Sequence, residues 1–429
     1  MKYIFIFLLL HTFLFAAGDQ QDLKQQLQKL FPGIVIKEKK CPQDFLFSWE
    51  VMIPQYLDHT QKSKGVFQQL IYIYHRGFNR PNVMVTEGYN IGDRVYEPTT
   101  ILEANQFSIE YRFCGKSVPS EIPWELLNHK QALKDFHLIQ KKLSKIYSGS
   151  WTVTGISKGG TTAALYSLTY PKKVKATVAY VAPFVLAQED PRTIEHYTKQ
   201  VSNEDCRKQV LNFQRAILKN RSAIVPMIDD LEIKDTVRFP LGSHRVLEYA
   251  AMEFPFSFWQ WGFNCTDLIS AESSPKEIFD YVEQVVDFNF YDDKTIQQFE
   301  PAFYQFLTEF GYYDFDTTGL SDLIQFEKNP SNLTFCPKGV KINYSPQYMK
   351  KMTDKAVRKG KNIIYIYGEV DTWTACAVTP SAKTNCKKYV AAGMGHRVRI
   401  QNLPENDKSE IYKLLGEWTK VQITRLKSS

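Results

Sequence analysis

The stretch that most constrains the fold is Trp151–Gly160, which reads WTVTGISKGG. It places Ser157 between Gly155 and Gly159, in the G-x-S-x-G pattern of a sharp strand-to-helix turn with a serine at its tip. Apolar residues before the turn predict a strand, and residues 161–168 after it predict a helix. Glycine suits both flanking positions because the backbone of such a turn is strained and closely packed. The stretch therefore predicts that Ser157 is a catalytic nucleophile rather than part of an ordinary turn.

Strand-like and helix-like segments alternate on both sides of this turn. The segments with the apolar patterns of strands are 45–53, 66–74, 82–88, 106–113, 174–181 and 362–367. The segments with helical patterns are 19–31, 123–147 and 405–421. This rhythm of strand, helix, turn, helix and strand predicts an α/β fold with a parallel sheet.

The rhythm changes between about residues 184 and 344, where strand patterns are scarce. Residues 204–222, 275–287 and 294–310 have helical character instead. A chain of 429 residues is long enough for one large domain with an insertion. We therefore expect an α/β-hydrolase sheet with a large, mostly helical cap insertion, divided as 19–184 (first part of the sheet domain), 185–345 (cap) and 346–429 (second part).

The first 18 residues have the pattern of a signal peptide. One positive charge at Lys2 precedes an apolar run, and Phe15-Ala-Ala-Gly18 offers small residues for cleavage before Asp19. The apolar run is too short to span a bilayer comfortably. The pattern predicts a secreted or periplasmic protein without stable membrane insertion.

Composition argues against several other classes of function. The net charge of +7 is spread along the chain without a long basic run, so nucleic-acid binding is not favoured. The seven cysteines include no C-x-x-C motif or His/Cys cluster, and no glycine-rich nucleotide loop is visible, so we expect neither a metal nor a cofactor. An odd count leaves at least one thiol unpaired, and Cys376 and Cys386 are close enough in sequence to close one loop.

A serine nucleophile needs a base, and the base needs an acid that orients it. In α/β hydrolases the order along the chain is serine, acid, histidine. Asp371 follows the predicted strand 362–367 directly, with Glu369 as a nearby alternative. Of the eight histidines, only His396 comes after Asp371. The predicted catalytic residues are therefore Ser157, Asp371 and His396.

The oxyanion hole of such a site uses two backbone N–H groups. One belongs to the residue after the nucleophile, here Lys158. The other comes from the loop after the strand 82–88, from Gly88 or Tyr89. The Lys158 side chain has no required role in this scheme, and one interpretation of it is a surface cation.

Eight stretches together resemble the secreted bacterial tripeptidyl aminopeptidases of the serine type (PS-10 type peptidases), with prolyl carboxypeptidase and dipeptidyl peptidases as more distant relatives. They are Tyr56–His59 with Phe67–Gln69, Thr86–Tyr89, Trp151–Gly160, Tyr180–Pro183, Thr308–Tyr312, Tyr367–Trp373 and Gly395–Arg397. The resemblance implies a capped α/β hydrolase that acts on peptides and cleaves after proline or a similar residue near the N-terminus. It also implies the same three catalytic residues.

An aminopeptidase of this kind needs an acid for the free amine of its substrate. Glu309 in the cap is the first candidate and Glu87 the second. Trp373, beside the predicted triad acid, is the candidate for a pocket wall. The aromatic run 254–263 is either a slot for a proline ring or cap core, and core is the commoner use of such a run.

Two other functions remain open from the sequence. An esterase or lipase would have the same triad, because the serine turn does not distinguish an ester from an amide. A non-catalytic binding protein could keep the fold, although the intact Ser157, Asp371 and His396 argue against it. The sequence leaves the oligomeric state undetermined.

Overall fold

The computed structural model describes residues 20–423. Its large sheet has nine strands in the order β1-β2-β3-β5-β4-β6-β7-β10-β11. In sequence order these strands are Val35–Glu38, Phe47–Tyr56, Val66–His75, Asn82–Thr86, Asn105–Ile109, Trp151–Ile156, Ala176–Tyr180, Ile363–Gly368 and Lys387–Ala391. β4 pairs in parallel with β5 and β6, whereas β1, β2 and β3 form an antiparallel edge. The predicted α/β fold is confirmed; the predicted signal peptide 1–18 lies outside the described residues.

The described residues divide into two compact units. The first contains the described chain up to Ala179, residues 361–364 and the chain from Asn406 onward. The second contains residues 180–360 and 365–405. That residues 185–345 form a cap inserted between the two parts of the sheet domain stays a prediction.

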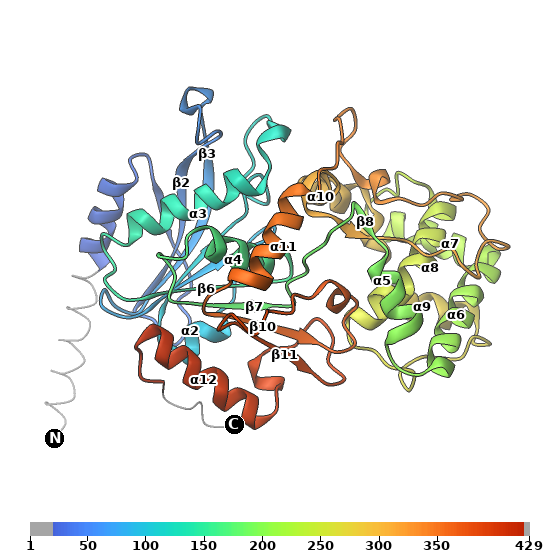
Figure 1. Ribbon diagram of the computed structural model, residues 1–429. Coiled ribbons are helices and arrows are strands. Elements are labelled where there is room, and N and C mark those ends of the chain that lie inside the picture. The colour runs from blue at the N-terminus through green and yellow to red at the C-terminus, as the bar shows by residue number, and fades with distance from the viewer. Residues whose placement is uncertain (1–19, 424–429) are drawn as a thin grey trace, which may run out of the picture. The chain divides into compact units, whose positions relative to one another are not determined.

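In the first unit, helices cover both faces of the sheet. α3 (His129–Leu143) and α4 (Lys158–Thr169) lie on one side, and α2 (Glu97–Ile101) and α12 (Glu405–Thr419) lie on the other (Figure 1). α3 is capped by Asn128, whose side chain accepts a hydrogen bond from the backbone N–H of Gln131. This cap explains why the helix starts later than position 123, where the apolar pattern already begins.

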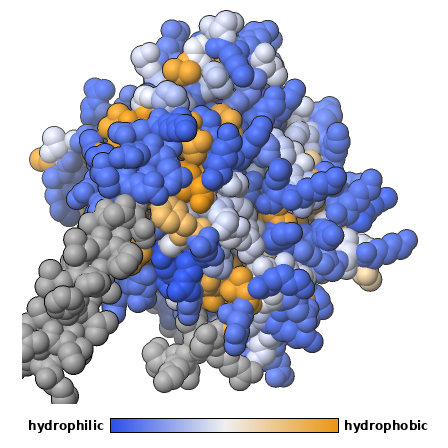
Figure 2. All heavy atoms as spheres, turned by 90° about the vertical axis from the view of Figure 1, so that its left-hand side faces the viewer, coloured by the Kyte–Doolittle hydropathy of each residue, from blue (hydrophilic) through white to orange (hydrophobic). Residues whose placement is uncertain are grey.

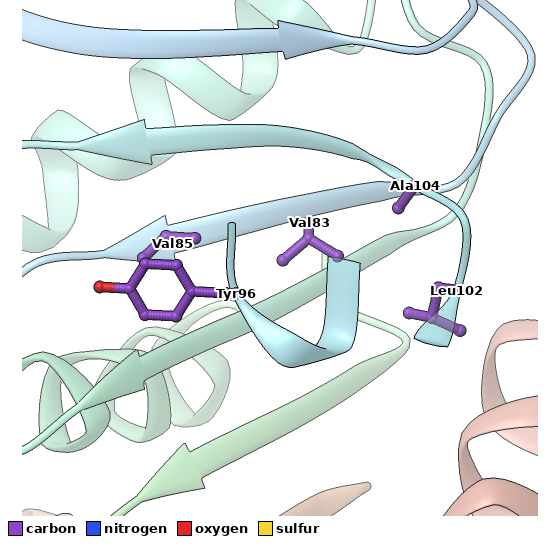
Figure 3. Close-up of a cluster of buried hydrophobic side chains, with 5 residues drawn as sticks. All are labelled: Val83, Val85, Tyr96, Leu102 and Ala104. Carbon is purple, nitrogen blue, oxygen red and sulfur yellow. The ribbon is translucent and has the colours of Figure 1, made fainter. Parts of the chain in front are cut away.

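A small apolar cluster fixes β4, the strand that leads to the predicted oxyanion loop. Its members are Val83, Val85, Tyr96, Leu102 and Ala104 (Figure 3). All are at most 3% exposed, and the ring of Tyr96 lies beside Val85 (Figure 3). Because burial of a valine or leucine side chain is worth about 1.5–3 kcal/mol, the cluster holds the end of β4 in a defined place.

The second unit is mainly helical between residues 204 and 305. Its helices there are α6 (Glu204–Lys219), α7 (Arg221–Asp235), α8 (Ser243–Gln260), α9 (Pro275–Val285) and α10 (Asp293–Gln305). α8 is buried over most of its length, which is typical of a central helix. The strands β8 (Glu189–Asp190) and β9 (Tyr312–Tyr313) have two residues each, so the predicted scarcity of strands in this segment is confirmed.

A disulfide joins Cys206 at the start of α6 to Cys265 after α8. Cys376 and Cys386, which are close enough in sequence to close one loop, form no disulfide with each other. The Cα atoms of Cys206 and Cys265 are 5.6 Å apart although 59 positions separate them in sequence. Helix packing, and not nearness along the chain, brings this pair together.

Apolar residues on the face drawn in Figure 2 form separate areas among hydrophilic ones. Within residues 20–423, no helix combines the length and the apolar character needed to cross a membrane.

Candidate active site

Ser157 occupies the junction between β6 and α4, in the first unit. Its backbone has φ 58° and ψ −130°, a conformation that non-glycine residues rarely adopt. The backbone N–H of Thr161 donates to the Ser157 carbonyl at 3.0 Å, so the helix begins directly at the serine. Residues held in such conformations cost about 1–3 kcal/mol and cluster at functional sites.

The two glycines of the turn leave no room for a side chain. A Cβ atom on Gly155 would collide with the Gly159 carbonyl and come within 2.7 Å of the Thr86 carbonyl oxygen. A Cβ atom on Gly159 would lie 2.5 Å from the same Thr86 oxygen. The Thr86 hydroxyl donates to the Gly159 carbonyl at 3.0 Å, which ties the end of β4 to the turn.

The loop after β4 lies against the turn, as the predicted oxyanion hole requires. A Cβ atom on Gly88 would be 2.8 Å from the backbone nitrogen of Gly159 and 2.8 Å from Cβ of Lys158. The side chains of Tyr89 and Ser157 share a hydrogen bond, and burial raises the pKa of the tyrosine. The sequence predicted Gly88, Tyr89 and Lys158 as backbone N–H donors of the oxyanion hole. It did not predict the side-chain hydrogen bond between Tyr89 and Ser157.

The side chain of Lys158 is buried, so the interpretation of it as a surface cation is wrong. The residue is 1% exposed. Its Nζ donates to the Gly88 carbonyl at 2.6 Å and lies 3.4 Å from the centroid of the Tyr111 ring. A carbonyl oxygen and a π face both stabilise a buried ammonium. Lys158 therefore links the start of α4 to the loop after β4.

His396 and Asp371 are held together in the second unit. Nδ1 of His396 is 2.7 Å from Oδ2 of Asp371, and the acid is fully buried. The backbone N–H of His396 donates to the Gln260 carbonyl at 2.6 Å. Gly395 permits this contact, because a Cβ atom there would lie 2.5 Å from the same carbonyl oxygen. The pair is arranged as an imidazole oriented by a carboxylate.

Glu369, the alternative acid, has a different partner. Its Oε2 accepts the backbone N–H of Gly393 at 2.8 Å, and its side chain is exposed. Trp373 lies beside Asp371, since its backbone N–H donates to Oδ1 of the acid at 3.1 Å. Its indole is 5% exposed, packed among aromatic rings.

The two predicted amine-binding acids have different surroundings. Glu87 is buried and accepts the Tyr96 hydroxyl at 2.7 Å; burial raises its pKa to about 7, although this hydroxyl and Arg94 oppose the shift. Glu309 lies in the short helix η5 (Phe306–Phe310) and is half-buried.

The buried titratable groups of the second unit that were not predicted from the sequence include His196 and Glu253. His196 is 6% exposed; burial lowers its pKa, and its environment includes the charge of Asp371. Glu253 on α8 is 8% exposed. It directly precedes the aromatic run 254–263, for which the sequence favoured the interpretation as core. Among residues 20–423, no three His, Cys, Asp or Glu side chains are grouped to hold a metal ion.

Comparison with known proteins identifies the family. The family model described as PS-10 peptidase S37 matches residues 16–428. The chain is 27% identical over 414 residues to the prolyl tri/tetrapeptidyl aminopeptidase of Streptomyces mobaraensis, covering 94% of this chain and 86% of the relative.

Among solved structures, the chain is similar to the proline iminopeptidase of Mycobacterium smegmatis, with 13% sequence identity and a TM-score of 0.39. The alignment covers 86% of this chain and 99% of that one. The chain is also similar to the Pyrococcus furiosus esterase Pf2001, with 13% sequence identity and a TM-score of 0.37, over 86% of this chain and 93% of that one. The match to the family model over nearly the whole chain shows that the protein is a serine peptidase and belongs to the PS-10 peptidases of family S37.

Proposed function

We propose that the protein is a secreted or periplasmic exopeptidase that releases di- or tripeptides from the N-termini of peptides. Proline, or a small apolar residue, is the preferred residue before the cut. The name of the Streptomyces mobaraensis relative, a prolyl tri/tetrapeptidyl aminopeptidase, supports both the end of the peptide that is recognised and the preference for proline.

The proposed reaction proceeds through an acyl-enzyme. The Ser157 hydroxyl attacks the carbonyl carbon of the scissile bond, and Nε2 of His396 accepts its proton. The same imidazole returns the proton to the leaving amine as the C–N bond breaks. Water then attacks the ester, again with His396 as the base, and the short peptide leaves with a free carboxylate. Asp371 keeps the imidazole oriented and stabilises its protonated form.

Backbone N–H groups stabilise the oxyanion of each tetrahedral intermediate in this proposal. The donors are the N–H of Lys158 and that of Gly88 or Tyr89. The close approach of Gly88 to the start of α4 supports this assignment. The helix N-terminus adds a favourable electrostatic field for negative charge at Ser157.

The observation that carries the proposal is the 2.7 Å hydrogen bond between His396 and Asp371. An exposed or differently paired histidine would leave Ser157 without an oriented base. The strained backbone of Ser157 adds independent support, because such strain clusters at functional sites.

Two assays test the proposal. A fluorophosphonate probe should label the wild-type protein and fail to label Ser157→Ala. A panel of peptide anilides with free and acetylated N-termini should show turnover of the free peptides, and fastest turnover with proline before the anilide. Faster hydrolysis of nitrophenyl esters than of every peptide anilide, with no effect of acetylation, would instead favour an esterase.

A further inference from the structure

Glu253 is a buried carboxyl group with unused hydrogen-bonding capacity. It lies on α8 and keeps only 8% of its surface exposed. The Ser257 hydroxyl donates to its Oε1 at 2.7 Å, and the Tyr313 hydroxyl interacts with the same carboxyl group. Its Oε2 accepts no hydrogen bond from any side chain or backbone group of residues 20–423. A buried oxygen without a donor is unfavourable, so a ligand that supplies one is stabilised there.

No basic side chain within the described part of the chain neutralises Glu253. The groups that interact with its charge are hydroxyls, including those of Tyr291 and Tyr313. Burial raises the pKa of Glu253 to about 7, although the Ser257 and Tyr313 hydroxyls lower it. An ammonium group would supply both the missing counter-charge and the missing donor, in the strong charge-assisted form of a hydrogen bond.

The rings around Glu253 suit a cation joined to an apolar chain. Phe256, three positions further along α8, stacks on Tyr313 with a centroid distance of 4.2 Å. Trp373 lies next in the series, 5.2 Å from Phe256 and 6.2 Å from Tyr313. Aromatic faces attract ammonium groups, and they also pack well against proline and other apolar residues.

Residues of this aromatic series contact both Glu253 and the acid of the proposed triad. The backbone N–H of Trp373 donates to Asp371. Tyr313, which interacts with Glu253, and Trp373, whose backbone contacts Asp371, are neighbouring rings with centroids 6.2 Å apart. The carboxyl group of Glu253 and the acid of the proposed triad therefore contact the same aromatic cluster within the second unit.

The two acids predicted from the sequence are less suited to this role. Glu87 already accepts the Tyr96 hydroxyl, and the charge of Arg94 acts on it. Glu309 is half-buried, so water competes for its charge and weakens any ion pair formed there.

We propose that Glu253 receives the free N-terminal ammonium of the peptide substrate, with Tyr313 and Phe256 as walls of that subsite. The inference rests on the proposed aminopeptidase function and adds the residue that measures the distance from the N-terminus. It makes Glu253 a specificity-determining residue, since its charge pairs with the end of the substrate and not with the reacting atoms.

A double-mutant cycle between enzyme and substrate tests the assignment. The substrates are Ala-Ala-Pro p-nitroanilide with a free and with an acetylated amine, and the proteins are wild type, Glu253→Gln and, as a matched control, Glu309→Gln. In the wild type, acetylation should lower kcat/KM about 30-fold or more, because a buried charge pair loses one partner. Glu253→Gln should lower kcat/KM for the free peptide by a similar factor and leave the acetylated peptide within about 3-fold of wild type, since both changes destroy the same contact.

The outcomes separate the two levels of the proposal. Wild type that is insensitive to acetylation would contradict the aminopeptidase function itself. Wild type that is sensitive, with Glu253→Gln equally sensitive, would overturn the role of Glu253 while leaving the function intact. Loss of sensitivity in Glu309→Gln instead would assign the contact to Glu309. Labelling of Glu253→Gln by the fluorophosphonate at the wild-type rate checks that the nucleophile is unaffected.

Glu253→Asp covers the case in which Glu253→Gln does not fold. This variant keeps the negative charge but moves the carboxylate back by the length of one methylene group. The proposal expects a reduced effect of acetylation, at most about a third of the wild-type factor, with kcat/KM for the acetylated peptide nearly unchanged. An effect of acetylation equal to that in wild type would overturn the assignment.

Discussion

The ammonium of Lys158 donates a hydrogen bond to the carbonyl of Gly88 at 2.6 Å, inside the first unit. The contact joins the residue after the proposed nucleophile to the loop that is proposed to provide the second oxyanion donor. Both segments are thus fixed relative to each other by a side chain whose burial the sequence did not reveal.

Lys158→Met should weaken catalysis more than binding. The variant keeps the length of the side chain but removes the donor to the Gly88 carbonyl, at a cost of about 1–3 kcal/mol. We expect kcat to fall about 10- to 100-fold with little change in KM, because the oxyanion contact strengthens only in the transition state. Steady-state kinetics beside Lys172→Met, an exposed lysine, would measure it; equal effects in both variants would contradict the role.

Ser157→Ala should remove turnover and leave the fold intact. The substitution deletes the proposed nucleophile, and loss of a triad member typically costs several orders of magnitude in kcat. Peptide anilide assays combined with circular dichroism would measure both properties. Retention of more than about a tenth of wild-type turnover in a folded variant would exclude Ser157 as the nucleophile.

Asp371→Asn and Glu369→Gln should behave differently. The first removes the charge that orients His396, so we expect a fall in kcat of about 10⁴-fold, as in other triads. The second removes only the negative charge of an exposed side chain, since the glutamine oxygen can still accept the Gly393 N–H, and it should change kcat less than about 3-fold. The reverse ranking in matched kinetic assays would assign the orienting role to Glu369.

Gly155→Ala should destabilise the protein strongly. The added methyl group would collide with the backbone of Gly159 and Thr86, which cannot move without breaking the turn. We expect a loss of about 3 kcal/mol or more in the free energy of unfolding, measured by urea denaturation. Gly92→Ala is the matched control, because its Cβ would meet only ordinary contacts with Arg94; an equal loss there would refute the steric explanation.

Glu87→Gln should flatten the dependence of stability on pH. Burial raises the pKa of Glu87 to about 7 from its ordinary value of 4.5, so the folded protein holds a proton that the unfolded chain has released. Wild-type stability should therefore fall as the pH rises between about 4.5 and 7, by about 1–3 kcal/mol. The neutral glutamine lacks this dependence. Urea denaturation at pH 5 and pH 8 would measure it, with exposed Glu121→Gln as the control that keeps the wild-type slope.

The candidate site residues that the sequence could predict are those indicated by glycine positions and by order along the chain. The pattern around Ser157 is informative because a tight turn excludes side chains from fixed positions, and a Cβ atom added at Gly155 or Gly159 would collide with the neighbouring backbone. Asp371 and His396 followed from their order along the chain, and they lie within hydrogen-bonding distance of each other.

What the sequence could not predict depends on packing between distant segments. β1 (Val35–Glu38) and β11 (Lys387–Ala391) were missed because both are short and rich in charged or exposed residues. The disulfide, and the burial of Lys158 and Glu253, depend on which helices and loops meet. Within one chain, no local pattern of residues carries that information.

The Cys206–Cys265 bond encloses α6, α7 and α8 in one covalent ring. Other peptidases in the same surroundings can cleave a peptidase in its exposed loops, such as the segment 236–242 between α7 and α8. A single cut there would leave both fragments linked through the two sulfur atoms. Such a nicked molecule would run as one species on a non-reducing gel and separate into two only after a thiol is added.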